Sequence, residues 1–169
     1  LMVHTYETPQ RPDALVLLDC GAPKCAPAVR AALVDVLAEA CAGTLKSLLE
    51  AGRATHLPLS PSGQGEFSGH DAQALPAMLR AVAAAGYSET TDFSRVLWLA
   101  SRRMQRTGST AILTTRLTPA VADAAIALSR MGSKMRFTLV TAGEPSEEEA
   151  QLLHLLFASG LETAHIRAA

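Results

Sequence analysis

The stretch Asp13-Ala-Leu-Val-Leu-Leu-Asp-Cys-Gly-Ala-Pro23 decides the fold. Its apolar run, Ala14–Leu18, ends at Asp19, and the turn-forming Gly21 and Pro23 follow. An unbroken apolar run without polar alternation is typical of a strand buried on both faces of a sheet. We therefore predict an α/β fold in which Asp19 lies at the carboxyl end of the first strand, where open parallel sheets bind their ligands.

Composition limits the classes of protein to which the chain can belong. Of its 169 residues 49% are hydrophobic and only 4% aromatic, which is enough for one aliphatic core. The 15 basic and 16 acidic residues give a net charge of −1, so we expect no nucleic-acid partner. No apolar run approaches the roughly 20 residues of a membrane span, so this fragment is not expected to cross a membrane.

The hydrophobic periodicity alternates between strand and helix along the chain. Short apolar runs predict strands at 14–18, 54–59, 66–68, 110–114, 135–141 and 162–166. Three- and four-residue spacings predict helices at 27–51, 71–85, 93–107, 118–131 and 146–158. We expect a three-layer fold: a mostly parallel central sheet, one antiparallel edge hairpin turning at 60–65, and helices on both faces. Residues 13–169 form the single domain, and 1–12 are a lead-in strand or a linker from an absent upstream region.

This order of elements resembles the von Willebrand factor type A (vWA) fold. The segments 1–7 (LMVHTYE), 15–19 (LVLLD) and 90–97 (TTDFSRVL) resemble one bacterial group of vWA-like proteins. These are domain-of-unknown-function proteins, often anchored in the membrane upstream and often encoded beside MoxR-type AAA ATPases. The resemblance implies a position at the cytoplasmic face, with attachment through an absent upstream segment. It also implies a protein partner, either an AAA ATPase or a membrane-associated assembly.

Many vWA domains hold Mg²⁺ at the ends of their strands. An Asp-x-Ser-x-Ser motif, a threonine from a later loop and an aspartate after the fourth strand supply oxygen ligands, which this cation prefers. Here the two serine positions are Gly21 and Pro23, and the last acid falls near Thr114 or Thr115. The resemblance therefore implies a degenerate site with no bound cofactor, although Mg²⁺ is the ion it would take. Its remnants are Asp19, Thr91 and Thr115.

An enzymatic alternative stays open at this stage. A small α/β hydrolase or transferase could use Asp19 with Cys20 or Cys25, provided that a histidine or second acid lies within hydrogen-bond reach as a base. The Cys-x-x-x-x-Cys spacing is not that of a zinc or thioredoxin-like site. The preferred hypothesis is a non-catalytic protein-interaction module. Its binding surface would be the loops 21–24, 88–92 and 114–118, the carboxyl-end rim, with Asp19, Lys24, Thr91, Asp92 and Arg116 as contact residues.

Overall fold

The computed structural model describes residues 13–59 and 65–168, which form a mixed α/β structure around one six-stranded sheet. The strand order is β3-β2-β1-β4-β5-β6, and only β3 runs antiparallel to its neighbour. The strands are β1 (Ala14–Leu18), β2 (Thr55–Pro58), β3 (Glu66–Gly69), β4 (Ser109–Thr114), β5 (Lys134–Thr141) and β6 (Glu162–Arg167). The predicted fold class is thereby confirmed, including the antiparallel edge pair.

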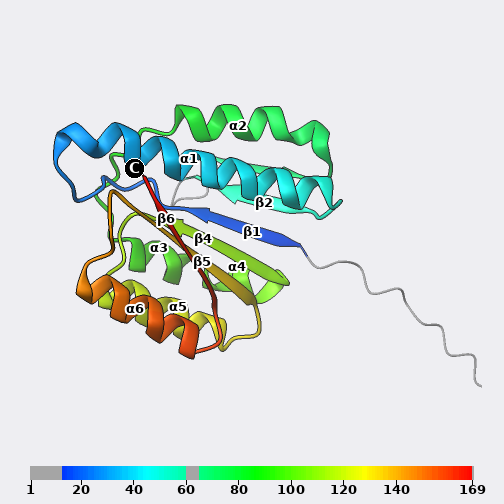
Figure 1. The fold of residues 1–169 in the computed structure, drawn as a ribbon. Helices are drawn as coiled ribbons and strands as arrows, with labels where there is room; N and C mark the ends of the chain where they lie inside the picture. The colour runs from blue at the N-terminus through cyan, green and yellow to red at the C-terminus, as the bar shows by residue number, and fades with distance from the viewer. Residues whose placement is uncertain (1–12, 60–64, 169) are drawn as a thin grey trace, which may run out of the picture.

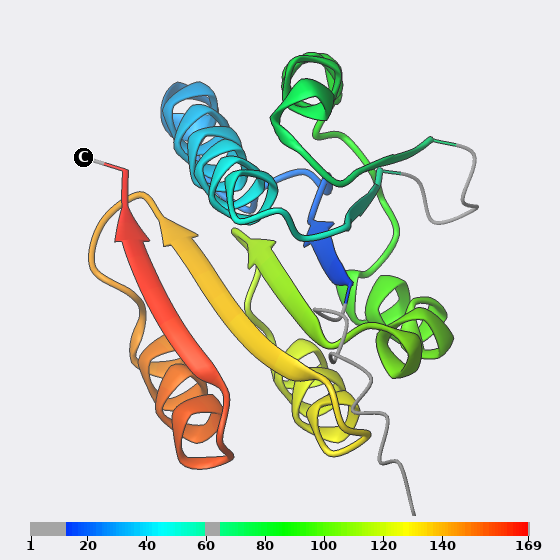
Figure 2. The same ribbon diagram turned by 90° about the vertical axis from the view of Figure 1, so that its right-hand side faces the viewer.

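Helices cover both faces of the sheet (Figures 1 and 2). On one face lie α1 (Pro27–Glu50) and α2 (Leu75–Ala84). The other face carries α3 (Phe93–Leu99), α4 (Ser101–Arg106), α5 (Pro119–Ser129) and α6 (Glu147–Ala158). None of the helices in the described ranges is long and apolar enough to cross a membrane.

Strand β1 shows why a continuous apolar run was needed. Leu15 and Leu17 pack into the core beneath α3 and α5, while Val16 and Leu18 pack into the core beneath α1. All five residues of β1 are buried, because successive side chains point to opposite faces and both faces are covered. The parallel pairing of β1 with β4 sets Leu17 beside Ile112 and Leu18 beside Leu113. The carboxyl ends of these two strands therefore lie side by side.

Helix starts follow local capping chemistry. The Thr118 hydroxyl accepts the Val121 backbone N–H at the start of α5. Ser146 and Glu149 form a reciprocal capping box at the start of α6. Asp92 accepts the Ser94 N–H at the start of α3, which fixes the end of the loop 88–92.

Two helix predictions need correction, and one prediction cannot be compared. The single helix expected at 93–107 is two helices, because three-residue hydrogen bonds tighten the chain at Ala100 (ψ −2°). The helix expected from Asp71 begins instead as a 3₁₀ turn, Ala72–Ala74. The turn predicted at 60–65 and the lead-in 1–12 lie almost wholly outside the described residues.

Candidate functional site

Asp19 lies buried at the carboxyl end of β1. Its backbone N–H donates to the Leu113 carbonyl at 2.9 Å, which extends the β1–β4 pairing by one residue. Its side chain is only 2% exposed. A carboxylate taken out of water in this way is stable only when it is paired and hydrogen-bonded.

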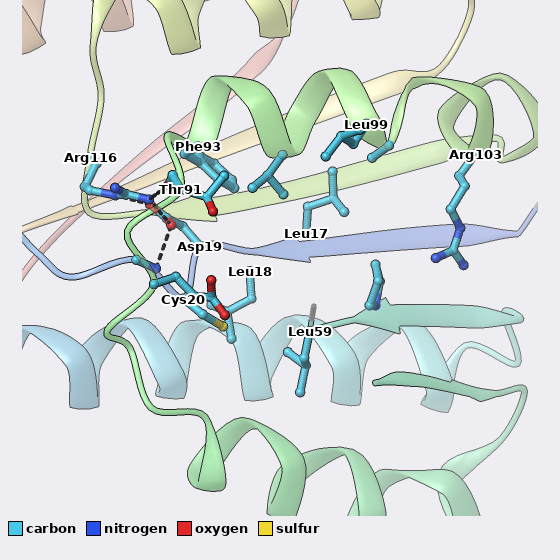
Figure 3. A pocket seen from close by; sticks show the side chains of 15 residues that line it. Leu17, Leu18, Asp19, Cys20, Leu59, Thr91, Phe93, Leu99, Arg103 and Arg116 are labelled. Carbon is cyan, nitrogen blue, oxygen red and sulfur yellow. Dashed lines mark hydrogen bonds and ion pairs between the residues drawn. The ribbon is translucent and has the colours of Figure 1, made fainter. Parts of the chain in front are cut away.

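Arg116 supplies that pairing. Its Nε donates to Asp19 Oδ2 at 2.9 Å and its Nη2 donates to Asp19 Oδ1 at 2.7 Å, a two-pronged ion pair (Figure 3). The same Nη2 also donates to the Thr91 carbonyl at 3.2 Å. The hydrogen bond to Asp19 raises the pKa of Arg116. Since the Arg116 side chain is 12% exposed, the pair is shielded from solvent and is screened by salt much less than a surface ion pair.

Two further donors complete the shell around the carboxylate. The Thr114 hydroxyl donates to Asp19 Oδ2 at 2.7 Å, and the Gly21 N–H donates to Oδ1 at 2.9 Å. Each carboxylate oxygen thus accepts two hydrogen bonds. Thr114 in turn accepts the Arg116 backbone N–H at 2.9 Å, so the loop after β4 is folded around the same cluster.

Gly21 is required by the position of the guanidinium. A Cβ built at Gly21 would lie 2.0 Å from Arg116 Nη2 and 2.2 Å from its Cζ. Any larger residue would therefore push the arginine away from Asp19. Gly21 also forms an isolated parallel bridge with Glu89: the Glu89 N–H donates to the Cys20 carbonyl and the Ala22 N–H donates to the Glu89 carbonyl. The bridge ties the loop 88–92 to the end of β1.

The predicted metal-site remnants are brought to one place, but with other roles. Thr91 contributes its carbonyl to Arg116, and Thr114, rather than Thr115, reaches Asp19. The Thr115 Oγ1 is buried and makes no hydrogen bond within the described part of the chain. Over the same residues no group of three or more His, Cys, Asp or Glu could hold a metal ion. The arrangement does not fit Mg²⁺, because Arg116, Thr114 and Gly21 occupy the carboxylate lone pairs that the ion would need.

The rim residues differ in their access to a partner. Lys24 and Asp92 are exposed, so both can meet another molecule. Asp19 is buried beneath the rim, and the Arg116 guanidinium is engaged in its ion pair with Asp19. Sequence reasoning placed both in the rim as contact residues, whereas the geometry makes them the support of the loops. The signal for the pair was available: an acid after the first strand and an arginine just after its parallel neighbour.

The cysteines next to Asp19 are poorly suited to nucleophilic attack. Cys20 is buried, and burial, followed by the charges of Asp19 and Glu89, raises its pKa to about 11. Burial likewise raises the pKa of Cys41 to about 12. A nucleophilic cysteine needs its thiolate, which these surroundings disfavour. Within the described ranges the hydrogen bonds of His56 go to Asp13 and Ser68, and that of His165 goes to Thr141.

An apolar pocket of about 190 Å³ opens beside the Asp19–Arg116 pair (Figure 3). We call it the α3 pocket. Helix α3 forms one wall with Phe93, Val96 and Leu99, and strands β1 and β2 form the other. Leu99 is 58% exposed at its mouth, and its neighbour Trp98 is 49% exposed. The polar end consists of Asp19, Cys20, Gly21, Glu89, Thr91 and Arg116, and the remaining lining residues are Leu17, Leu18, Pro58, Leu59, Ala100 and Arg103.

Sequence reasoning did not find this pocket. Its apolar lining comes from three separate elements whose residues all follow ordinary core patterns. The signal that could have pointed to it is the run Val96-Leu-Trp-Leu99, which places apolar residues on more than one side of a short helix.

Comparison with known proteins does not assign the chain to a family, since no family model and no curated protein matches it.

Proposed function

We propose that this chain is a non-catalytic protein-interaction module with a vWA-like fold, and that its partner docks on the carboxyl-end rim. One observation carries the proposal. At the position where a parallel sheet presents reactive groups, Asp19 is fully engaged by hydrogen bonds, while an apolar pocket opens directly beside it. Such a site offers shape and apolar surface rather than a free base or a metal ligand.

The α3 pocket suits one apolar side chain of a partner. Its volume of about 190 Å³ is below the roughly 300–1,000 Å³ of typical small-molecule sites. Filling it with a leucine or phenylalanine would contribute roughly 1.5–3 kcal/mol by removing apolar surface from water. Lys24 and Asp92, both exposed on the rim, would add charge complementarity at the edge of the contact.

The family and the partner are part of the same proposal. The order of elements along the chain follows that expected from the vWA resemblance, which supports a vWA-like domain with a degenerate metal site. On that basis the partner is an AAA ATPase of the MoxR type or a membrane-associated assembly. The domain would work at the cytoplasmic face, attached to the membrane through an upstream segment.

The enzymatic alternative has less support. Burial, together with the charges of Asp19 and Glu89, raises the pKa of the Cys20 thiol, which is the opposite of activation. A carboxylate that accepts four hydrogen bonds, as Asp19 does, has no lone pair free for general-base work. An interaction module therefore accounts for the site better than a hydrolase or transferase.

The test measures binding of a purified MoxR-type AAA ATPase to the immobilised domain by biolayer interferometry. Leu99→Glu places a charge at the mouth of the α3 pocket and should weaken binding at least tenfold. Phe157→Glu on α6 is the matched control, because Phe157 is also an exposed apolar helix residue (66%) but lies in the last turn of α6, at the opposite edge of the sheet from the rim. Circular dichroism would confirm that both variants are folded.

The rim charges are tested with Lys24→Glu and Asp92→Ser, since serine preserves the cap of α3 while removing the charge. A charge reversal of Glu50→Lys with Arg130→Glu serves as the control, because these exposed residues lie at the carboxyl ends of α1 and α5, at the opposite edge of the sheet. If Phe157→Glu or this control reversal weakens binding and the rim variants do not, the partner binds another face and the proposal is wrong. Absence of any binding would exclude the ATPase as the partner.

A further inference from the structure

The two faces of the sheet are covered unequally. Beyond α1, the strands β5 and β6 extend without a helix above them, as Figure 2 shows (gold and red strands). A groove of about 710 Å³ runs there between α1 and the strands β4, β5 and β6. We call it the α1 groove. It lies on the opposite face of the sheet from α3 and is separate from the α3 pocket.

Small side chains line the α1 groove on the side of the helix. On α1 these are Ala40, Gly43 and Ser47, spaced three and four residues apart along one side of the helix. A Cβ built at Gly43 would meet no atom within 4 Å, so the space above it is open. The floor is formed by small and aliphatic residues of the strands, among them Ala164 and Ile166.

The rim of the α1 groove is basic. Lys134 and Arg136 are exposed on β5, and Arg53 lies at the same end, where it donates to the Ser109 hydroxyl. Glu162 is the one acid among the described lining residues. Neither Lys134 nor Arg136 forms a salt bridge with a residue in the described ranges. The chain as a whole has a net charge of −1, so this local excess of positive charge is not a property of the entire surface.

The size and surroundings of the groove suit a helix. A helical turn, taken as a cylinder about 10 Å across and about 5.4 Å long, occupies roughly 420 Å³. The groove exceeds that volume and lies beside α1 in the same layer. Small residues on α1 would let a second helix approach closely, and a helix in this position would complete the layer over β5 and β6.

We propose that the α1 groove binds an amphipathic helix of a partner protein in which acidic residues flank the apolar face. The helix places small and aliphatic residues against α1 and the strands, and its carboxylates lie against Lys134, Arg136 and Arg53. Charge complementarity selects an acidic helix, because a basic one would bring like charges together at the same end.

The probe is a synthetic, stapled amphipathic helix with Leu and Ala on one face and Glu along the margins of that face, and a twin in which Lys replaces Glu. Fluorescence anisotropy should show the acidic peptide binding at least tenfold more tightly than the basic twin, and more weakly as salt rises. Lys134→Glu with Arg136→Glu should invert this preference. Gly43→Trp, which fills the groove from a position with free space, should weaken both peptides at least tenfold.

Two controls separate groove binding from other effects. Arg95→Glu with Arg102→Glu reverses two exposed basic residues on the opposite face and should leave binding unchanged. Gly43→Ala adds one methyl group and should bind nearly as well as the wild-type chain. The proposal is overturned if the acidic peptide does not bind below millimolar concentration, if both peptides bind equally, or if Gly43→Trp has no effect. A dimer in sedimentation that Gly43→Trp dissociates would assign the groove to a second copy instead.

Discussion

Removing the Arg116 guanidinium should destabilise the domain strongly without a large loss of packing. Arg116→Met keeps most of the aliphatic length but leaves Asp19 buried, with its side chain 2% exposed and its charge unpaired. Breaking a buried ion pair by removing one partner typically costs about 3–5 kcal/mol. Because domains are stable by only about 5–15 kcal/mol, this is a large share of the total.

Urea unfolding followed by circular dichroism measures the effect. With a slope of roughly 2 kcal/mol per molar, the midpoint of Arg116→Met should fall by about 1.5–2.5 M. Asp19→Asn removes the charge and keeps one acceptor oxygen, which can serve the Gly21 N–H or the Thr114 hydroxyl but not both, because these groups donate to different oxygens of Asp19. Its cost should still be smaller, about 1–3 kcal/mol, since the guanidinium left without its partner is more exposed than Asp19 (12% against 2%). The double variant should cost less than the sum of the two by at least about 1 kcal/mol, since the two groups contact each other directly.

The reasoning is refuted if Arg116→Met costs less than about 1 kcal/mol at pH 7, or if the two single substitutions are additive. Asp19 and Arg116 would then be no more than a surface-like pair.

Four further outcomes follow from the structure. Gly21→Ala should destabilise the wild-type chain by displacing the guanidinium, yet cost little in an Arg116→Ala background; an equal cost in both would contradict the steric account. Millimolar MgCl₂ should not raise the melting temperature, whereas a site filled at ten times its dissociation constant would add about 1.4 kcal/mol. At pH 8 a thiol reagent followed by mass spectrometry should label the partly exposed Cys25 well before the buried Cys20 and Cys41. Burial raises the pKa of Cys20 from 9.0 to about 11 and that of Cys41 from 9.0 to about 12, so the folded state favours the protonated thiols. The resulting stabilisation is complete below about pH 9 and is lost as the pH rises through about 11–12. Denaturation at several pH values would measure this loss.

The fold could be predicted because its main signals are local. The apolar run Ala14–Leu18 predicts a strand buried on both faces. Pro119 fits the first turn of a helix, and Ser146 caps one with its hydroxyl, so both residues indicate helix starts. The division at Ala100 could not be predicted from spacing. The buried residues Phe93, Leu97 and Met104 keep helical spacing across it, so the hydrophobic pattern does not register a change of hydrogen bonding in the backbone.

The site was predicted less completely, since it depends on contacts between distant residues. Asp19, Thr91 and Arg116 were all placed at the same edge of the sheet, and the structure brings them together. The sequence did not show that the Arg116 side chain points toward Asp19, which lies 97 positions earlier in the chain. That direction depends on the space left by Gly21, a property of three-dimensional packing and not of motif spacing.

The positive charge of the Arg116 side chain changes which interactions are available to a partner at the rim. In a site that holds a metal ion, the ion can accept a carboxylate from the partner, and affinity then depends on the free metal concentration. Here the positive charge belongs to Arg116 and is already engaged by Asp19. The partner binding that we propose at the carboxyl-end rim would therefore draw on burial in the α3 pocket and on exposed charges such as Lys24. Affinity for a partner there should be insensitive to chelators, moderately sensitive to salt, and most sensitive to a charge at Leu99.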